Sequence, residues 1–215
     1  DQLGVDWVFE KLKPILENPN IKKVGQNIKY DYIVLKNEGI NLDGIVFDTM
    51  LASYLLNPSS RGHNMDALAL EYLGLATIQY KDVVGTASKE IGFDEVEIER
   101  ATEYAAEDAD ITLRCHNVLK EKLSQTKSLQ KVLADIDLPL IPVLSDVEQN
   151  GALVNADELK IQSNNLGQRI NGLEEKAFKE AGKELNLAST KDLRAIFFDE
   201  MDLPVIKKTP GGQPS

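Results

Sequence analysis

The chain has 215 residues, of which 42% are hydrophobic and 27% charged, a composition that argues against a disordered chain and fits one or two folded domains. Charges or prolines break every apolar stretch before the roughly 18 residues that a membrane span needs, so the sequence predicts no membrane partner. The net charge of −11 argues against an autonomous nucleic-acid-binding protein, because duplex affinity depends largely on Lys and Arg that neutralise phosphates. Residues 151–215 carry 9 Lys/Arg against 10 Asp/Glu, so the acidic surplus lies in the first 150 residues.

The single cysteine and the two ends of the chain bear on where the protein works and how much of it is present. Cys115 cannot form an internal disulfide, which fits a reducing compartment, and we expect a cytoplasmic protein. The chain starts at Asp1 without a methionine and stops at Ser215 in a run of Pro, Gly and Lys. We therefore expect a fragment of a longer protein.

Hydrophobic periodicity predicts an α/β arrangement in the first half of the chain. The expected elements are helices over residues 7–16, 28–37, 49–56 and 64–73, with short strands over 21–24 and 44–48 between them. Residues 75–95 have the pattern of a mixed loop, and the longest helix of this half is expected from about residue 94 to 123. Strands that alternate with helices are typical of a parallel sheet.

The pattern beyond residue 125 is helical throughout. A short helix is expected after Pro142 and ends at Asn150-Gly151, and a long helix follows over residues 157–181. A further helix begins at Ser189, three residues before Asp192, in an entry that resembles a capping box. The sequence therefore predicts two units, an α/β part over 1–125 and an all-helical part over 126–215.

Asp108 is the most informative residue of the long helix, because it falls inside an apolar stripe where Ala or Leu is usual. A carboxylate buried without a partner would cost several kcal/mol or lose its charge. Tyr104 precedes it by four residues and projects from the same helix face, whereas Asp110 should point outward. Two interpretations stay open: a functional carboxylate, or a buried one bonded to a neighbouring backbone group or lysine.

A second pair with the same spacing, Asn27 and Asp31, follows the first predicted strand and a turn. Taken alone, Asn27 is typical of a helix N-cap, and Asp31 is typical of a solvated first-turn carboxylate. Together with Asp108, the pair indicates carboxylates from two distant segments that converge on one site. Hard divalent cations require that arrangement.

Several segments resemble one enzyme family. Residues 23–31, Lys-Val-Gly-Gln-Asn-Ile-Lys-Tyr-Asp, resemble the second exonuclease motif of the DNA polymerase I family, and residues 100–110, Arg-Ala-Thr-Glu-Tyr-Ala-Ala-Glu-Asp-Ala-Asp, resemble its third motif. Residues 47–51 and 63–68 match segments between these motifs. Residues 185–193 and 207–215 are similar to the opening of the polymerase domain, at the base of its thumb.

The resemblance covers essentially the whole chain and implies its fold. Residues 1–125 are identified as a ribonuclease H-like 3′-5′ exonuclease domain that lacks its first strands. Residues 126–215 are identified as the helical, C-terminally truncated start of the polymerase domain.

The resemblance also implies a reaction, the hydrolysis of a 3′-terminal phosphodiester with two divalent metal ions, Mg²⁺ or Mn²⁺. It implies that Asp108 holds one ion, that Asp31 helps to hold the other, and that Tyr104 orients the attacking water. The whole protein would synthesise and proofread DNA on a primer-template duplex during replication and repair, as a monomer.

Three further residues are implied as substrate-binding residues. Gln26 and Asn27 would border the single-stranded 3′ end of the DNA. Phe93 resembles a residue that packs against a terminal base, and ordinary core packing explains Phe93 equally well.

The family's first motif, an Asp-x-Glu on the opening strand, has no counterpart in the chain. Asp146-Val-Glu148 has the right letters but follows the other motifs and lies in a helical stretch, so we reject it. With Asp31 and Asp108 alone, water would have to supply most of the six or so oxygen ligands of each ion. We therefore expect weak metal binding and negligible hydrolysis by this chain, and, because the missing strands are central ones, exposed apolar helix faces.

An alternative function is a non-catalytic, exonuclease-like scaffold or DNA-binding domain that braces a polymerase. The pairs Asn27/Asp31 and Tyr104/Asp108 favour an active site in the whole protein, since drift would also have struck these positions. The polymerase-like segment after residue 130 argues against a stand-alone RNA exonuclease of the same superfold. Cys115 is expected to pack in the core rather than to react.

Overall fold

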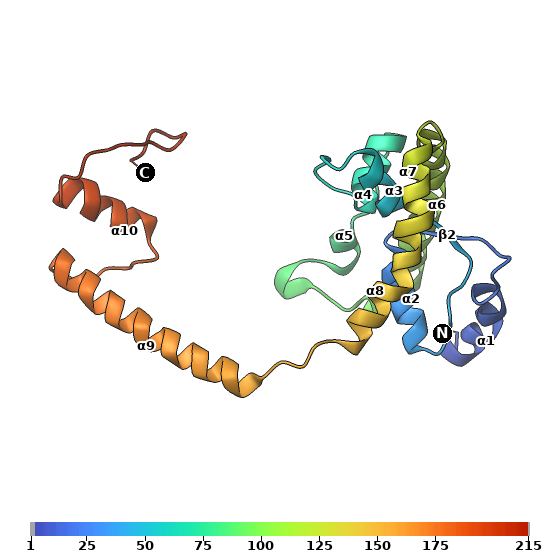
Figure 1. Cartoon of the computed structure of the whole chain (residues 1–215), viewed down its shortest axis with the longest axis horizontal. Coiled ribbons are helices and arrows are strands. Elements are labelled where there is room, and N and C mark those ends of the chain that lie inside the picture. Colours follow the sequence, from blue (N-terminus) through green and yellow to red (C-terminus); the bar gives the residue numbers. More distant parts are fainter. Residues whose placement is uncertain (1–2, 215) are drawn as a thin grey trace. The chain divides into compact units, whose positions relative to one another are not determined.

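The computed structural model describes residues 3–214, which divide into two compact units after Gly151 (Figure 1). The first unit is mostly helical with a small sheet, and the second is helical. No helix in residues 3–214 combines the length and the apolar character needed to cross a bilayer. The units are defined by packing alone, so the assignment of residues 1–125 and 126–215 to two functional domains stays a prediction.

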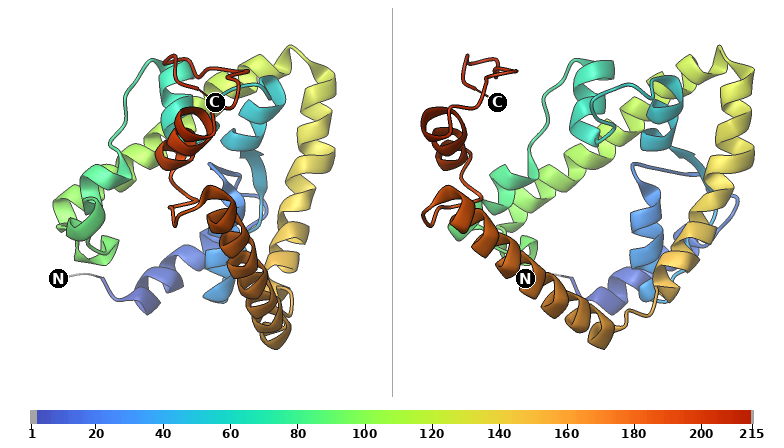
Figure 2. Two further views of the ribbon diagram at one scale, coloured as in Figure 1. Left: turned by 90° about the vertical axis from the view of Figure 1, so that its left-hand side faces the viewer. Right: turned by 60° about the vertical axis from the view of Figure 1, so that its left-hand side comes forward.

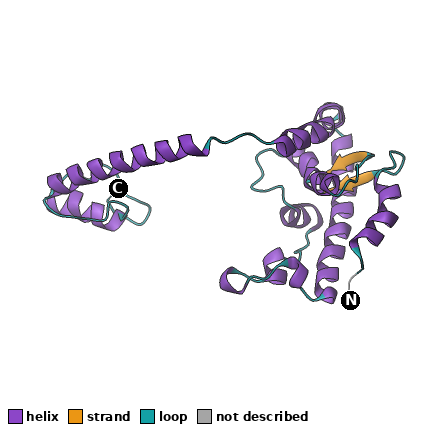
Figure 3. Cartoon of the chain, turned by 90° about the horizontal axis from the view of Figure 1, so that it is seen from below, coloured by secondary structure: helices purple, strands orange, loops and turns teal. Residues whose placement is uncertain are grey.

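Within residues 3–214, the sheet of the first unit has two parallel strands joined by a helix. Strand β1 (Lys23–Gly25) pairs with β2 (Ile45–Asp48), with Lys23 opposite Ile45 and a register shift before Val24. Helix α2 (Ile28–Asn37) forms the crossover that a parallel pair requires. Figure 3 shows the two strands in orange with purple helices around them. The predicted α/β character is therefore confirmed, and the α2 bounds agree with the prediction.

Gly44 makes the close approach between the two strand segments. Its φ of +73° lies in the left-handed region, and a Cβ there would meet the carbonyl oxygen of Ile21 at 2.6 Å. The same glycine accepts a backbone hydrogen bond from Lys23 at 2.9 Å. A residue with a side chain could not keep β1 this close to the segment before β2.

The main core of the first unit lies between α3 (Thr49–Leu56), α6 (Ile98–Ser124) and the neighbouring helices. Cys115 and Leu119 belong to the buried face of α6, so the prediction that Cys115 packs in the core is confirmed. Ile98, by contrast, is 46% exposed, so the buried face of α6 begins further along the helix. The buried core residues are Phe47, Ala52, Leu68, Ala69, Ile111, Cys115, Leu119, Leu123 and Leu133.

The chain from residue 127 to 150 is one helical segment, where the sequence predicted only a short helix after Pro142. It consists of α7 (Lys127–Val132), the π-helical turn η4 (Leu133–Asp137) and α8 (Leu138–Asn150). A proline lacks an N–H group, and its ring crowds the carbonyl four residues earlier. The wider π turn directly before Pro139 accommodates that crowding, so the helix continues through Pro139 and Pro142.

Two ion pairs and a hydrogen bond connect α8 to α2. Lys29 pairs with Glu148, and Lys36 pairs with Asp146. Gln149 donates a hydrogen bond to Asn37 at 3.0 Å. The two carboxylates of the rejected Asp-x-Glu sequence are thus partners of lysines on a neighbouring helix, which agrees with their rejection as metal ligands.

Asp48 connects the beginnings of two helices. One carboxylate oxygen accepts the N–H of Ile28, the first residue of α2, at 2.7 Å, and the other accepts the N–H of Leu51 in α3 at 3.0 Å. Asn27 occupies the cap position of α2 with a φ of 55°, but its side chain makes no cap hydrogen bond. The predicted capping role of the Asn27 side chain was therefore wrong, because Asp48 satisfies the first N–H of α2.

The first unit also contains further helices and helical turns. The segment predicted as a loop over 75–95 contains one short helix and two 3₁₀ turns, because Val83, Val84 and Val96 form a small core of their own. The remaining elements are α1 (Val5–Leu16), α4 (Met65–Leu68), its π-helical continuation η1 (Ala69–Leu73), α5 (Tyr80–Val84), η2 (Ala87–Lys89) and η3 (Phe93–Glu95).

The expected exposure of apolar helix faces is confirmed in the first unit. Val5 and Trp7 of α1 are 62% and 53% exposed, and Val143 and Val147 of α8 are 53% and 62% exposed. These side chains lie on helix faces that no described element covers.

The second unit consists of the long helix α9 (Ala156–Ala181), α10 (Thr190–Arg194) and the π-helical turn η5 (Ala195–Glu200) (Figure 2). Asn155 caps α9 by accepting the N–H of Glu158 at 3.0 Å. Ser189 caps α10 by accepting the N–H of Asp192 at 3.2 Å, as predicted.

Replacement of Asp48 should destabilise the first unit more than the loss of an ordinary helix cap. Asp48→Ala leaves two N–H groups without a partner, and since each lost cap costs about 1 kcal/mol, we expect a loss of about 2 kcal/mol. Asn64→Ala is the matched control, because Asn64 caps only α4, through the N–H of Ala67 at 2.9 Å. Urea unfolding of the two variants measures both losses. Equal losses would contradict the double cap.

Candidate active site

A cavity of about 460 Å³ lies between β1 and α6 and is lined by both Asp31 and Asp108. The two carboxylates come from α2 and α6, which are far apart in the sequence. The small side chains of Ala105 and Ala109 leave the α6 wall open on this side. The lining residues are Val24, Gly25, Gln26, Asp31, Met65, Ala105, Asp108, Ala109, Thr112 and Leu113.

Asp108 brings an unsatisfied carboxylate oxygen to this cavity. Its Oδ1 is buried, and no hydrogen-bond partner for it lies within residues 3–214. Burial raises the pKa of Asp108, the Tyr104 hydroxyl lowers it, and the charges of Glu107 and Asp66 raise it further. The alternative interpretation was a buried carboxylate bonded to a backbone group or a lysine. No such partner of this oxygen is found among the described residues.

Tyr104 lies beside Asp108 on α6, as the four-residue spacing predicted. Burial raises the pKa of Tyr104 to about 12, and the negative charge of Asp108 adds to this rise. The phenol therefore stays protonated at neutral pH and remains able to donate a hydrogen bond. Asp110, two residues after Asp108, is exposed and forms a 3.4 Å ion pair with Arg114, so its predicted outward position is confirmed.

Asp31 lies in the first turn of α2, and its side chain is exposed while it lines the cavity. Partial desolvation raises the pKa of its carboxyl, and the charge of Asp48 contributes to the rise. Because the residue is exposed, water screens part of this effect. Asp31 thus keeps the solvated first-turn position expected from its sequence, and it also belongs to the cavity.

Gln26 and Asn27 have different surroundings. Gln26 lines the same cavity as Asp31, but its amide nitrogen donates to the carbonyl of His63 at 2.8 Å, and its amide oxygen accepts the Thr49 hydroxyl. Asn27 lines a separate cavity of about 280 Å³ beside α8. Gln26 therefore lies in the cavity of the carboxylates, with its amide held by two hydrogen bonds, whereas Asn27 lies outside that cavity.

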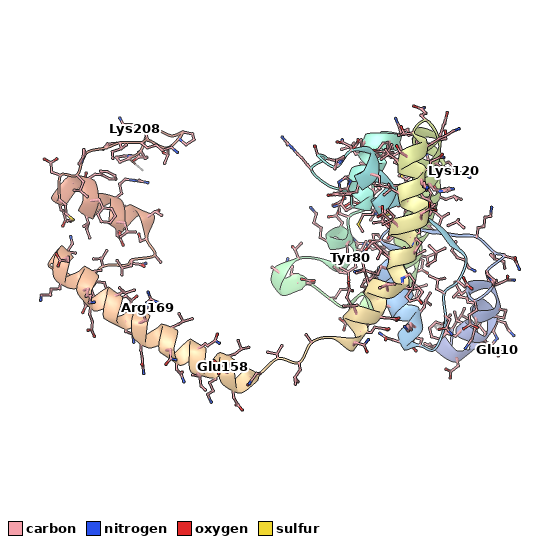
Figure 4. All side chains as sticks on the ribbon, viewed as in Figure 1. Glu10, Tyr80, Lys120, Glu158, Arg169 and Lys208 are labelled. Carbon is pink, nitrogen blue, oxygen red and sulfur yellow. The ribbon has the colours of Figure 1, made fainter. Side chains whose placement is uncertain are left out.

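Phe93 belongs to a cluster of three aromatic rings. It stacks on Tyr80, with ring centroids 6.1 Å apart and an angle of 20°, and meets Tyr104 edge to face at 5.9 Å. Tyr80 also meets Tyr104 edge to face at 6.1 Å. Figure 4 labels Tyr80, the first residue of α5. Tyr80 was not predicted from the sequence, because its segment has no clear periodicity.

Two further acidic residues were missed. The carboxylate of Asp66 accepts the Thr77 hydroxyl at 2.6 Å, and its charge raises the pKa of both Asp108 and Tyr104. Asp48 was noticed only as part of a motif, and its position directly before a predicted helix was the signal for its capping role.

The donor set gives partial support for a cation site. Within residues 3–214, no group of three or more His, Cys, Asp and Glu side chains is arranged to hold a metal ion. The unsatisfied Oδ1 of Asp108 and the shared cavity with Asp31 nevertheless fit a hard cation, which prefers carboxylate oxygens.

Comparison with known proteins finds two matching families. Residues 1–124 match the family described as 3′-5′ exonuclease, and residues 156–215 match DNA polymerase family A. The chain is 51% identical to the DNA polymerase I of Pseudomonas aeruginosa over 100% of the chain and 24% of that protein. It is 42% identical to the DNA polymerase I of Rhizobium leguminosarum over 99% of the chain and 21% of that protein.

A solved structure is also similar. The POL domain of Pol1 from M. smegmatis, in complex with DNA primer-template and dNTP, has a TM-score of 0.72 and 27% sequence identity. The match covers 96% of this chain and 32% of that chain. The present chain thus spans less than a third of the length of each of these proteins.

Removal of the Asp108 charge should stabilise the metal-free protein. The pKa of Asp108 is raised in the folded state, so its contribution to folding is fully present below the unfolded pKa and is lost as the pH rises through the folded pKa. In a chelating buffer at about pH 7, Asp108→Asn should therefore increase the free energy of unfolding, and this gain should vanish near about pH 3.

Asp110→Asn is the matched control for this measurement. Asp110 is exposed and belongs to a surface ion pair, so its replacement should change the stability little at either pH. Urea unfolding at the two pH values measures both variants. A loss of stability in Asp108→Asn at neutral pH would show that the ionised form is well accommodated.

Proposed function

Since the chain belongs to the 3′-5′ exonuclease family and continues into DNA polymerase family A, we propose that its cavity is the site that removes nucleotides from a 3′ end. The observation that carries this proposal is the buried, unsatisfied Oδ1 of Asp108 at the edge of a cavity that Asp31 also lines. A cation would give this oxygen the partner that it lacks, and a cation at such a position would assist the hydrolysis of a phosphodiester.

The proposed cofactor is a pair of divalent ions, Mg²⁺ or Mn²⁺. Asp108 would hold one ion, and Asp31 would help to hold the other. Bound there, the cations would neutralise phosphate charge and lower the pKa of the attacking water. The raised pKa values of both carboxyls agree with this role, because a cation would replace the missing stabilisation of their charged forms.

The remaining groups act on the strand and on water. Tyr104, protonated at neutral pH, would donate a hydrogen bond that orients the attacking water beside Asp108. Gln26 would border the 3′ end from its braced position, and Phe93, which is 38% exposed, would pack against the last base. Asn27 is proposed to act from the neighbouring cavity, on a part of the strand further from the carboxylates.

For the whole protein, we propose DNA synthesis with exonucleolytic proofreading in replication and repair, on a ribonuclease H-like exonuclease fold. Its partners would be a single-stranded 3′ end and a primer-template duplex. The whole protein is proposed to act as a monomer in the cytoplasm, and the free thiol of the buried Cys115 agrees with a reducing compartment.

The chain by itself should hydrolyse DNA very slowly. Asp31 and Asp108 supply only a few of the oxygens that two ions need, so most ligands would be water. Binding is therefore a better test than turnover.

A Mn²⁺ titration followed by electron paramagnetic resonance tests the proposed site. We expect weak binding to the unaltered chain and a loss of roughly tenfold or more in both Asp108→Asn and Asp31→Asn, because even supporting residues of a metal site cost that much. Asp110→Asn, which alters an exposed carboxylate of the same helix, should bind as the unaltered chain does. Equal binding by all four proteins would mean that the cavity holds no cation, and the non-catalytic scaffold would then be the better description.

A further inference from the structure

Helix α3 carries two buried hydroxyl groups on one face. Thr49 and Ser53 are both 0% exposed, and residues four apart are neighbours on a helix surface. Both hydroxyls take part in hydrogen bonds that lead to Gln26, which lines the cavity of the two carboxylates. Thr49 contacts the Gln26 amide directly, whereas Ser53 is connected to it through His63.

The Ser53 hydroxyl attaches the loop that follows α3. Its Oγ lies 2.9 Å from Nδ1 of His63, and the His63 ring meets the ring of Tyr54 edge to face at 5.4 Å. His63 is thereby held to α3 by two neighbouring residues. The backbone carbonyl of His63 accepts a hydrogen bond from the amide nitrogen of Gln26 at 2.8 Å, so the position of this acceptor depends on Ser53.

The Thr49 hydroxyl determines which way the Gln26 amide is turned. A carbonyl can only accept a hydrogen bond, so the amide nitrogen must face His63 and the amide oxygen must face Thr49. The Thr49 hydroxyl also donates toward the carbonyl of Gly25 at 3.2 Å. Both neighbours of the hydroxyl are therefore acceptors, and its hydrogen stabilises this one orientation of the amide.

One N–H of the Gln26 amide is left for a ligand. A glutamine side chain offers two N–H donors and two oxygen lone pairs, and the bonds to His63 and Thr49 use one of each. Among residues 3–214, no partner of the second N–H is found. A single strand in the cavity would present sugar and phosphate oxygens, which accept hydrogen bonds whatever the base is.

We propose that Thr49 is a positioning residue, whose hydroxyl holds the Gln26 amide so that its second N–H donates to a sugar or phosphate oxygen of a bound single strand. The inference rests on the proposed function, since it requires a 3′ end in the cavity. Without the Thr49 hydroxyl, the amide would turn more freely. Strand binding would then have to order it, and the affinity would fall.

Strand binding by Thr49 variants tests this role. Binding of a short oligothymidylate to the full chain is measured by fluorescence anisotropy in a chelating buffer. Thr49→Val keeps the shape of the side chain but removes the hydroxyl, and it should weaken binding about fivefold, the effect of one hydrogen bond. Thr49→Ser keeps the hydroxyl and should bind within about twofold of the unaltered chain.

Ser145→Ala is the matched control for the loss of a buried hydroxyl. Ser145 is 0% exposed, and its hydroxyl donates to the carbonyl of Ile141 within α8 at 2.7 Å. Its replacement should leave strand binding unchanged. A loss equal to that of Thr49→Val would show that any buried hydroxyl matters, and it would overturn the inference.

A double-mutant cycle with Gln26→Ala separates positioning from a general loss of structure. Gln26→Ala should weaken binding about fivefold or more, and the addition of Thr49→Val should weaken it no further, because Thr49 acts through the amide. Urea unfolding measures the stability of each variant separately. If Thr49→Val does not fold, Thr49→Cys takes its place in the cycle, because a thiol is only a weak donor.

The outcomes of the cycle distinguish the inference from the proposed function. A further loss on adding Thr49→Val to Gln26→Ala would show that Thr49 acts by another route and would overturn the inference. Unchanged binding in Gln26→Ala alone would also overturn it, while the proposed function would survive. If the unaltered chain binds no single strand, the proposed function fails and the inference fails with it.

Discussion

The arrangement of the first unit depends on one buried carboxylate. Asp48 ends β2, begins α3 and also accepts the first N–H of α2, so a single side chain joins three elements. Its burial raises its own pKa, which means that the N–H groups around it must offset a cost that an exposed cap would not have. Asp31, one turn into α2, and Gln26, bonded to Thr49 at the start of α3, take their positions from this joint.

Helix α6 supplies the other wall of the site. Its C-terminal half is held in the main core by Cys115 and Leu119, while Tyr104 and Asp108 lie in the preceding turns, outside that core. The site therefore lies between α6 and β1, a strand whose three residues are all only partly buried. Desolvated carboxylates are stable there only because the surrounding core outweighs their cost.

Local signals explain most of what the sequence could predict. The bounds of α2 and α3 follow from glycine, asparagine and proline stops that act within a few residues, and Asp108 was conspicuous because a carboxylate interrupts an apolar stripe. The second bond of Asp48, the path of the helix through Pro139 and Pro142, and the turn of Asn27 toward α8 depend on contacts between distant segments. The position of Tyr80 also depends on such distant contacts. The N–H of Ile78 donates to Glu107 of α6, and the N–H of Ile91 donates to the carbonyl of Val84.

The two-stranded sheet in the described part of the chain has a consequence for self-association. Each strand has a second edge whose backbone groups no described strand covers, and such edges can pair with an extended segment of another molecule. The strands are short, with three and four residues, so an added strand would find few hydrogen-bonding positions. Because the strands are short, we expect them to promote fibril growth less than a longer open edge would at the same protein concentration.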